Sequence, residues 1–305
     1  MYKFFLPLLT ALLAMSAFAL PPQQSNAPPA PATAQTSPGE VRVEQNVLYG
    51  TVNGSDLRLD VYQPGLNRGT TRYPAVLLIH GGGWVSFDKS TMQRMSEFLA
   101  RNGFVAFAVD YRLFHGAENR WPAQLDDVQR AVRWVRAHAS KYNVNPDRIG
   151  AFGHSAGAQL AALLGMESTR DNSDPTLARY SSRVQAVVDV SGPSDFTVQD
   201  DPEGQVFLTS FLGAEYSKHP EIWRDASPAY HVDKHDAPFL IVHGTKDEDV
   251  PMAQAQELYD KLHAAHVPVK LVKVDDGHTF QTPDARRQLA LESLEFFSEN
   301  LGGTH

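Results

Sequence analysis

A five-residue segment, Gly153-His154-Ser155-Ala156-Gly157, constrains the fold of this chain more than any other feature. It follows an apolar run that ends at Phe152 and precedes an Ala/Leu-rich run over 156–165, so it joins a predicted strand directly to a predicted helix. Such an abrupt junction puts its central residue in a strained backbone conformation, and the residues two positions away must lack a Cβ. The glycines meet this demand. The serine hydroxyl is then exposed at a sheet edge, beside the positive end of the helix.

Strand-like and helix-like segments alternate along the rest of the chain. A hairpin-like opening over 41–62 is followed by apolar runs of strand length at 74–80, 104–109, 148–152, 184–190, 238–243 and 269–274. Helical spacing of apolar residues occurs at 90–101, 122–142, 156–165, 253–265 and 288–297. This order predicts an α/β fold with a mainly parallel central sheet and helices on both of its faces.

The stretch 192–230 breaks this alternation, because aromatic residues stand there among many polar ones. An insertion at the carboxyl ends of strands usually covers a pocket, so we expect a small cap-like insertion. Phe196, Phe211 and Trp223 from this stretch, together with Trp84, are candidates for lining a substrate pocket. Taken singly, each of these aromatic residues fits core packing equally well.

The first 39 residues differ in composition from the remainder. Lys3 precedes an apolar stretch over 4–18, and Ala17-Phe18-Ala19 has the small–x–small pattern of a cleavage site, so residues 1–19 are predicted to be a signal peptide cut after Ala19. The apolar stretch is shorter than the roughly 20 residues of a bilayer span. We therefore expect a secreted or periplasmic protein with no stable membrane insertion after cleavage, an uncleaved anchor being the alternative. Residues 20–39 are a Pro/Ala-rich flexible linker, and 40–305 are the catalytic domain.

Composition excludes several kinds of site. The absence of cysteine rules out disulfides, thiolate metal sites and cysteine nucleophiles. The 27 basic and 35 acidic residues give a net charge of −8 without a Lys/Arg cluster, which argues against nucleic acid as a partner. Two histidine pairs with helical spacing, His231/His235 and His263/His266, could bridge a metal on a helix. We expect neither a metal nor an organic cofactor.

A serine hydroxyl becomes a nucleophile only with a base in hydrogen-bond reach and a third group that orients the base. With a serine of this kind, the chain order is serine, acid, histidine. The acid-rich loop after the predicted strand 238–243 contains Asp247 and Asp249, and a Gly-His pair with His278 follows the last predicted strand. We therefore predict a catalytic triad of Ser155, Asp247 and His278, with Asp249 as the alternative acid.

A glycine-rich loop, His80-Gly81-Gly82-Gly83-Trp84, follows the strand that ends at Ile79. Its glycines allow backbone N–H groups to approach a substrate closely. Acyl transfer places negative charge on the carbonyl oxygen, and each preorganised donor at that oxygen contributes about 3–4 kcal/mol. We predict an oxyanion hole formed by the N–H groups of Gly82, Gly83 and Ala156, whereas His80 is expected to order the loop.

Taken together, these residues resemble the α/β-hydrolase superfamily. More narrowly, they are similar to bacterial carboxylesterases related to feruloyl and acetyl-xylan esterases and to hormone-sensitive-lipase-like enzymes. The resemblance extends from about residue 41 to 301, and its segments are 73–84, 109–113, 121–127, 145–149, the serine motif, 247–251 and 277–278. It implies an α/β-hydrolase fold and hydrolysis of a small-molecule or carbohydrate-linked ester through an acyl-enzyme, without metal or cofactor. Trp84 resembles the feruloyl-esterase side, and Ala158 stands where many relatives carry a second glycine.

Two other functions remain open at this point. Serine exopeptidases of the prolyl-peptidase kind share this fold and triad, but they usually carry a tyrosine directly after the serine and an N-terminal propeller. Here Ala156 occupies that position. A catalytically silent binding module on the same fold typically loses the serine or the histidine, and this chain has both Ser155 and His278.

Overall fold

The computed structural model describes residues 40–65, 71–198 and 202–302. The predicted signal peptide and linker lie outside the described residues. Eight strands form one sheet in the order β1-β2-β4-β3-β5-β6-β7-β8. The strands are β1 (Val41–Val52), β2 (Ser55–Pro64), β3 (Tyr73–Ile79), β4 (Val105–Val109), β5 (Val144–His154), β6 (Ala186–Val190), β7 (Phe239–Gly244) and β8 (Val269–Val274). β2 runs antiparallel to β1 and β4, whereas all other neighbours are parallel, so the mainly parallel sheet is confirmed.

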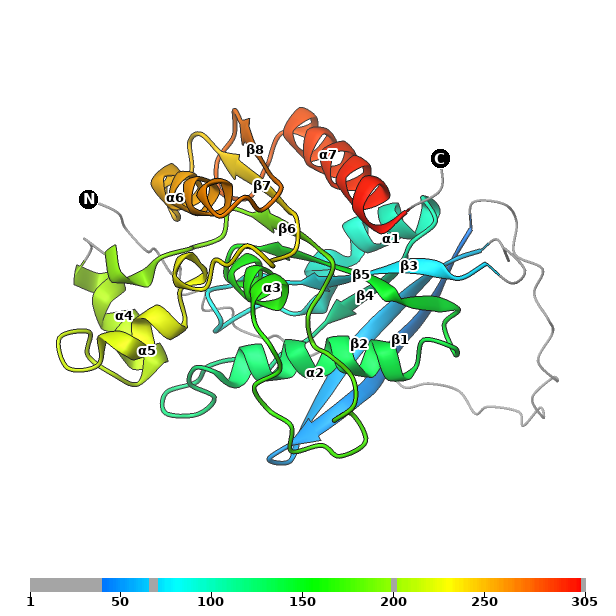
Figure 1. Ribbon diagram of the computed structural model, residues 1–305, viewed down its shortest axis with the longest axis horizontal. Helices are drawn as coiled ribbons and strands as arrows, with labels where there is room; N and C mark the ends of the chain where they lie inside the picture. Colours follow the sequence, from blue (N-terminus) through cyan, green and yellow to red (C-terminus); the bar gives the residue numbers. More distant parts are fainter. Residues whose placement is uncertain (1–39, 66–70, 199–201, 303–305) are drawn as a thin grey trace, which may run out of the picture.

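Helices cover both faces of this sheet (Figure 1). One face packs against α1 (Gln93–Arg101) and α7 (Pro283–Leu301) through strand residues such as Val76 and Leu78. The other face packs against α2 (Ala123–Ala137), α3 (Ala156–Met166) and α6 (Met252–Ala264) through residues such as Leu77 and Ile79. Alternate side chains of β3 thus enter two separate cores, which is why the strand is apolar throughout.

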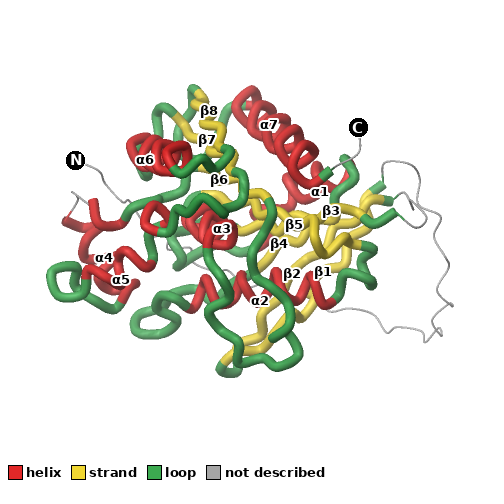
Figure 2. The backbone as a smooth tube through the Cα atoms, in the orientation of Figure 1, coloured by secondary structure: helices red, strands yellow, loops and turns green. Residues whose placement is uncertain are grey.

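The cap lies between β6 and β7, where the sequence predicted it. It contains the 3-10 helices η2 (Phe196–Val198) and η3 (Pro228–Tyr230) and the short helices α4 (Pro202–Leu212) and α5 (Pro220–Asp225). A further 3-10 helix, η1 (Lys89–Met92), precedes α1. Figure 2 shows α4 and α5 at one end of the molecule, beyond the strands of the sheet. None of the helices in the described ranges has the length and apolar character needed to cross a bilayer.

The sheet register gathers four loops at one edge. Ile79 on β3 pairs with Gly153 on β5, which pairs with Asp189 on β6. Farther along the sheet, Gly244 at the end of β7 lies opposite Val274 at the end of β8. Because parallel strands end at the same edge, the loops after β3, β5, β7 and β8 emerge together, and these loops carry the predicted site residues.

Candidate active site

Ser155 occupies the sharp turn between β5 and α3. Its backbone angles are φ 55° and ψ −122°, the strained conformation that the sequence predicted. A Cβ on Gly153 would lie 2.1 Å from the carbonyl oxygen of Gly157, and one on Gly157 would lie 2.2 Å from that of Ile79. Neither position tolerates a side chain without backbone movement, so the two glycines are what allows the turn to pack against β3.

The hydroxyl of Ser155 is uncommitted. The residue is held through its backbone, whose N–H donates to the carbonyl of Val190 at 2.8 Å. Its side chain does not cap α3, and its Oγ makes no hydrogen bond to another described residue. The hydroxyl therefore lies at the positive end of α3, available to an external group.

Asp247 and His278 form the predicted acid–base pair across 31 residues of chain. His278 Nδ1 lies 2.8 Å from Asp247 Oδ2. The other carboxylate oxygen accepts the backbone N–H groups of Asp249 at 3.0 Å and Val250 at 2.8 Å. Of the two candidate acids, Asp247 is the one whose carboxylate bonds His278, whereas Asp249 is exposed and its backbone supports the carboxylate of Asp247.

The electrostatics favour an ionised acid. The side chain of Asp247 has no exposed surface, and that of His278 is 12% exposed. Burial raises the pKa of Asp247, but the hydrogen bond and charge of His278 and the N–H of Val250 outweigh it, so that the pKa lies below its ordinary value. Asp247 is thus a carboxylate that fixes the proton of the histidine on Nδ1 and leaves Nε2 available.

A second histidine, His243, supports the acid loop. Its Nε2 donates to the carbonyl of Val250 at 2.8 Å and lies 3.3 Å from Asp247 Oδ2. The residue is fully buried, and this burial lowers its pKa, so it is neutral. Sequence reasoning gave His243 no role, although its place at the end of a buried strand, four residues before Asp247, was the available signal.

The glycine-rich loop contains backbone N–H groups that have no acceptor among the described residues. Gly82 and Gly83 have φ of +100° and +58°, and a Cβ on Gly82 would lie 2.2 Å from the carbonyl oxygen of Ser86. The carbonyl of Gly82 accepts the N–H groups of Val85 and Ser86, both at 3.1 Å, which closes the turn. The N–H groups of Gly82, Gly83 and Ala156 donate to no described residue. All three predicted oxyanion donors are therefore free in this part of the chain.

Side chains beneath this loop hold it in place. His80 Nδ1 lies 2.8 Å from the carbonyl of Gly81, and the ring of His80 stacks on Tyr111 at 4.3 Å. The Tyr111 hydroxyl donates to the carbonyl of His80 at 3.0 Å. Burial lowers the pKa of His80, so it is neutral and orders the loop as expected. On the other side, Trp84 Nε1 donates to Oε1 of the buried Gln159 at 3.2 Å.

Trp84 joins two of the other three predicted pocket residues, whereas Trp223 packs against Tyr216 instead. Trp84 stacks on Phe211 at 4.7 Å and meets the edge of Phe196 at 5.6 Å, and Phe211 has no exposed surface. Phe196 and Trp223 line a hollow of about 310 Å³ whose other residues are Thr197, Gln205, Thr209, Glu215, Tyr216 and Ser217. These aromatic residues thus join the cap to the glycine-rich loop, and two of them also border a space on the cap.

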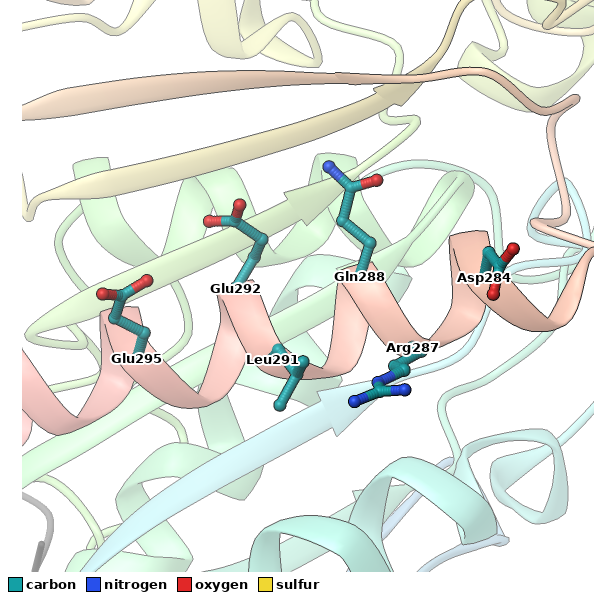
Figure 3. A pocket seen from close by; sticks show the side chains of 6 residues that line it. All are labelled: Asp284, Arg287, Gln288, Leu291, Glu292 and Glu295. Atoms are coloured by element: carbon teal, nitrogen blue, oxygen red, sulfur yellow. The ribbon is translucent and has the colours of Figure 1, made fainter.

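A second hollow of about 310 Å³ lies along α7 (Figure 3). Figure 3 shows that all of its lining side chains come from this helix, with Gln288 and Glu292 on one side and Arg287 and Leu291 on the other. Its lining includes neither Ser155 nor any residue of the loops at the sheet edge, and its polar groups converge on no common point. It therefore offers no catalytic arrangement.

One grouping in the described part of the chain offers three potential metal ligands. Oxygen or nitrogen atoms of Asp247, Asp249 and His278 lie within 4.8 Å of one another. Two of these groups already bond each other, so the acid–base pair accounts for their closeness. His231, which the sequence marked as a metal candidate, bonds Glu167 through Nδ1 and the carbonyl of Asp225 through Nε2. Both of its ring nitrogens are occupied.

Sheet order, serine turn, acid–base pair and free N–H groups together define an α/β-hydrolase. The chain belongs to the BD-FAE family, whose sequence model matches residues 59–262. It is 34% identical over 221 residues to the probable carboxylic ester hydrolase LipM of Mycobacterium tuberculosis, covering 70% of this chain and 49% of LipM. The chain thus spans about half the length of this curated relative.

Solved structures show the same fold. The native esterase Est2 of Thermogutta terrifontis has a TM-score of 0.71 and 28% identity, over 86% of this chain and 92% of that one. Est2 has also been solved phosphorylated by paraoxon. A truncated carbohydrate esterase from gut microbiota has a TM-score of 0.73 and 28% identity, over 86% of this chain and 96% of that one. These similarities confirm the predicted α/β-hydrolase fold.

Proposed function

We propose that this protein is a serine carboxylesterase that hydrolyses carboxylic esters through an acyl-enzyme. One observation carries the proposal: a hydrogen-bonded acid–base pair, Asp247 and His278, lies at the same sheet edge as an uncommitted serine hydroxyl and three uncommitted N–H groups. This is the set of groups that acyl transfer needs.

Acylation begins when Ser155 Oγ attacks the ester carbonyl and His278 Nε2 takes the hydroxyl proton. Asp247 holds the other ring nitrogen at 2.8 Å and stabilises the imidazolium that forms. The N–H groups of Gly82, Gly83 and Ala156 receive the negative charge of the tetrahedral oxygen. His278 then gives its proton to the leaving alcohol, and the acyl group remains on the serine.

Deacylation repeats these steps with water. His278 takes a proton from the water as it attacks the acyl carbonyl, and the same N–H groups hold the second tetrahedral oxygen. The proton returns to Ser155 Oγ, which leaves as the free serine. The acid product departs, and each proton and electron pair is accounted for without a further reagent.

The comparisons support an ester as substrate. LipM is named as a probable carboxylic ester hydrolase, and Est2 is an esterase that paraoxon phosphorylates. The similarity to a carbohydrate esterase supports a small-molecule or carbohydrate-linked ester. Trp84, Phe196, Phe211 and Trp223 remain our candidates for shaping the substrate pocket, directly or through packing.

The test is hydrolysis of chromogenic esters, acetyl through decanoyl plus a feruloyl ester, by the full chain and by Ser155→Ala. We expect turnover by the native protein and a loss of about 10⁴–10⁶-fold in kcat in the variant. Equal activity of the two proteins would contradict the proposal. Inertness of the native protein across esters, with cleavage of peptide substrates, would favour an exopeptidase instead.

Secretion is a separate part of this proposal and rests on the signal-like composition of residues 1–19. Expression of the full chain in a bacterial host is expected to give a product in the periplasm or medium that begins at Leu20. N-terminal sequencing of the fractionated protein tests this, and an uncut cytoplasmic product would contradict it.

A further inference from the structure

His154, the residue immediately before the serine, has a contact that the mechanism above does not use. Its Nε2 lies 2.9 Å from the backbone carbonyl oxygen of His278, and the two rings are 5.0 Å apart. A carbonyl oxygen only accepts, so Nε2 of His154 carries the proton and donates it. The two residues are 124 positions apart in the chain, so this bond joins two of the loops at the sheet edge.

The backbone of His278 has few other anchors. Among the described residues, its N–H donates to no backbone group, and its carbonyl is bonded by His154 alone. Its neighbours in the loop are held through Asp276, which accepts from Gly277 and Thr282. The position of the His278 imidazole is thus fixed at two points, Asp247 at its ring and His154 at its carbonyl.

The anchor itself is rigid. His154 is the last residue of β5 and pairs with Val190 on β6, so its backbone belongs to the sheet. On its other side the ring faces the glycine-rich loop, since a Cβ on Gly81 would lie 3.1 Å from His154 Nδ1 and 3.2 Å from Ser155 Cβ. A single dipeptide, His154-Ser155, therefore carries both the nucleophile and the group that holds the base loop.

We propose that His154 is a positioning residue that sets the distance between Ser155 Oγ and His278 Nε2 by donating its Nε2–H to the His278 carbonyl. This proposal rests on the proposed function. It differs from a merely structural role, because it predicts that losing the donor changes the rate of serine activation more than it changes substrate binding or folding.

Burial of His154 and the positive charge that His278 acquires both favour the neutral form of the His154 ring. Burial is the larger of these effects, and together they lower the pKa of His154 to about 4 despite the hydrogen bond to the carbonyl. A neutral donor next to His278 holds the loop without opposing the imidazolium that forms during acyl transfer. A lysine or arginine at this position would place a permanent charge there.

The test compares His154→Leu, which removes the donor, with His154→Gln, which keeps an N–H at similar reach. Two rates are measured: ester hydrolysis, and the second-order rate of phosphorylation by paraoxon. Misplacement of a base by about 1 Å costs about 10²-fold, so we expect the leucine variant to lose about 10–100-fold in both rates with KM within about twofold. The glutamine variant is expected to stay within about fivefold of the native protein.

Native-like rates in a folded leucine variant would overturn the proposal, as would a glutamine variant that is as slow as the leucine variant. The paraoxon rate separates the two proposals. If the native protein reacts with paraoxon but hydrolyses no ester, the esterase proposal is contradicted. The paraoxon rates of the two His154 variants still test the proposal for His154.

NMR of the native protein with ¹⁵N-labelled histidine needs no variant. At pH 7 we expect a neutral His154 with its proton on Nε2. A proton on Nδ1, or a charged ring, would overturn the proposal even if neither variant folds.

Discussion

The sheet edge that carries Ser155 and the cap between β6 and β7 are built on different principles. At the edge, glycines with no room for a side chain and hydrogen bonds between distant loops fix each group, as at Gly157 and between His278 and Asp247. In the cap, Phe211 is fully buried and its ring stacks on Trp84 of the glycine-rich loop at 4.7 Å, so aromatic packing contributes much of the contact between the two. Directional bonds position reacting atoms, whereas dispersion and burial hold a shape that tolerates change.

This difference explains why the sequence predicts the type of reaction more readily than it predicts the substrate. The groups at the edge have one workable arrangement, and short motifs encode it. The cap can keep its packing while its surface residues vary, so its hollow near Phe196 and Trp223 can change without disturbing Ser155. Substitutions in the two regions should therefore change different quantities.

The largest expected effect separates the two acids at the edge. Asp247→Asn keeps the shape but favours the wrong tautomer of His278, and we expect kcat to fall by about 10⁴-fold. Asp249→Asn is the matched control, because its exposed side chain does not bond His278, and it should stay within about threefold of native kcat. Comparable losses in the two variants would show that the acid was assigned wrongly.

In the cap, Phe211→Ala removes a side chain with no exposed surface. We expect the free energy of unfolding to fall by about 3–5 kcal/mol, with a far smaller change in kcat than Asp247→Asn gives. Phe207→Ala is the control, since this ring stacks on Phe211 at 6.3 Å but is only partly buried, and it should cost about 1–2 kcal/mol. Urea unfolding measures both losses, and equal losses would mean that the cap core is not centred on Phe211.

Acid pH is expected to weaken the edge through His154. Its pKa is about 4 in the folded protein, below the 6.5 of an exposed histidine. Between these values the unfolded chain binds the proton more readily, so this contribution to stability is complete above about pH 6.5 and is lost as the pH falls toward 4. The free energy of unfolding should fall by an amount on the order of 2 kcal/mol, because the ring of His154 is partly exposed.

Urea unfolding at pH 7 and pH 4.5 tests this effect. His154→Gln has no titratable ring, so its stability should fall less between these pH values than that of the native protein. Parallel losses in the two proteins would assign the acid sensitivity to other groups, such as the buried His80 and His243.

An effect of similar size is expected at the link between the two regions. Gln159 accepts from Trp84 Nε1 at 3.2 Å and donates to the carbonyl of Ala226 at 2.7 Å, so it ties the glycine-rich loop to the cap. Gln159→Leu leaves both partners buried without a bond, and we expect a loss of about 1–3 kcal/mol in stability. Gln159→Glu keeps the acceptor for Trp84 and serves as comparison. A stable leucine variant would show that packing alone joins the two regions.

The sequence predicts the serine turn and the acid–base pair because their signals are local. Gly153 and Gly157 each lie two residues from Ser155, and Asp247 and His278 lie in the loops after β7 and β8. The contact of His154 could not be predicted, because His278 is 124 residues away and only the folded sheet brings the two together. For His243 the only signal was its place four residues before Asp247. The cap shows the same limit, since apolar side chains for packing and for a pocket are identical in sequence.

Element ends show where local chemistry prevails over periodicity. The last helix was predicted over 288–297 but begins at Pro283, because the Thr282 side chain accepts the N–H of Ala285 and Pro283 needs no N–H partner. The helix predicted over 122–142 ends at Ala137. The chain then turns through Asn143, which has φ of 54°, a conformation that a helix does not contain.

Covalent labelling can locate the reactive group directly. The native protein is treated with paraoxon, and the adduct is mapped by peptide mass spectrometry beside His278→Ala. We predict one adduct per chain, on Ser155, and a rate of labelling that falls by at least about 10³-fold in the variant. An adduct on another residue, or undiminished labelling of His278→Ala, would contradict the assignment of Ser155 as a nucleophile activated by His278.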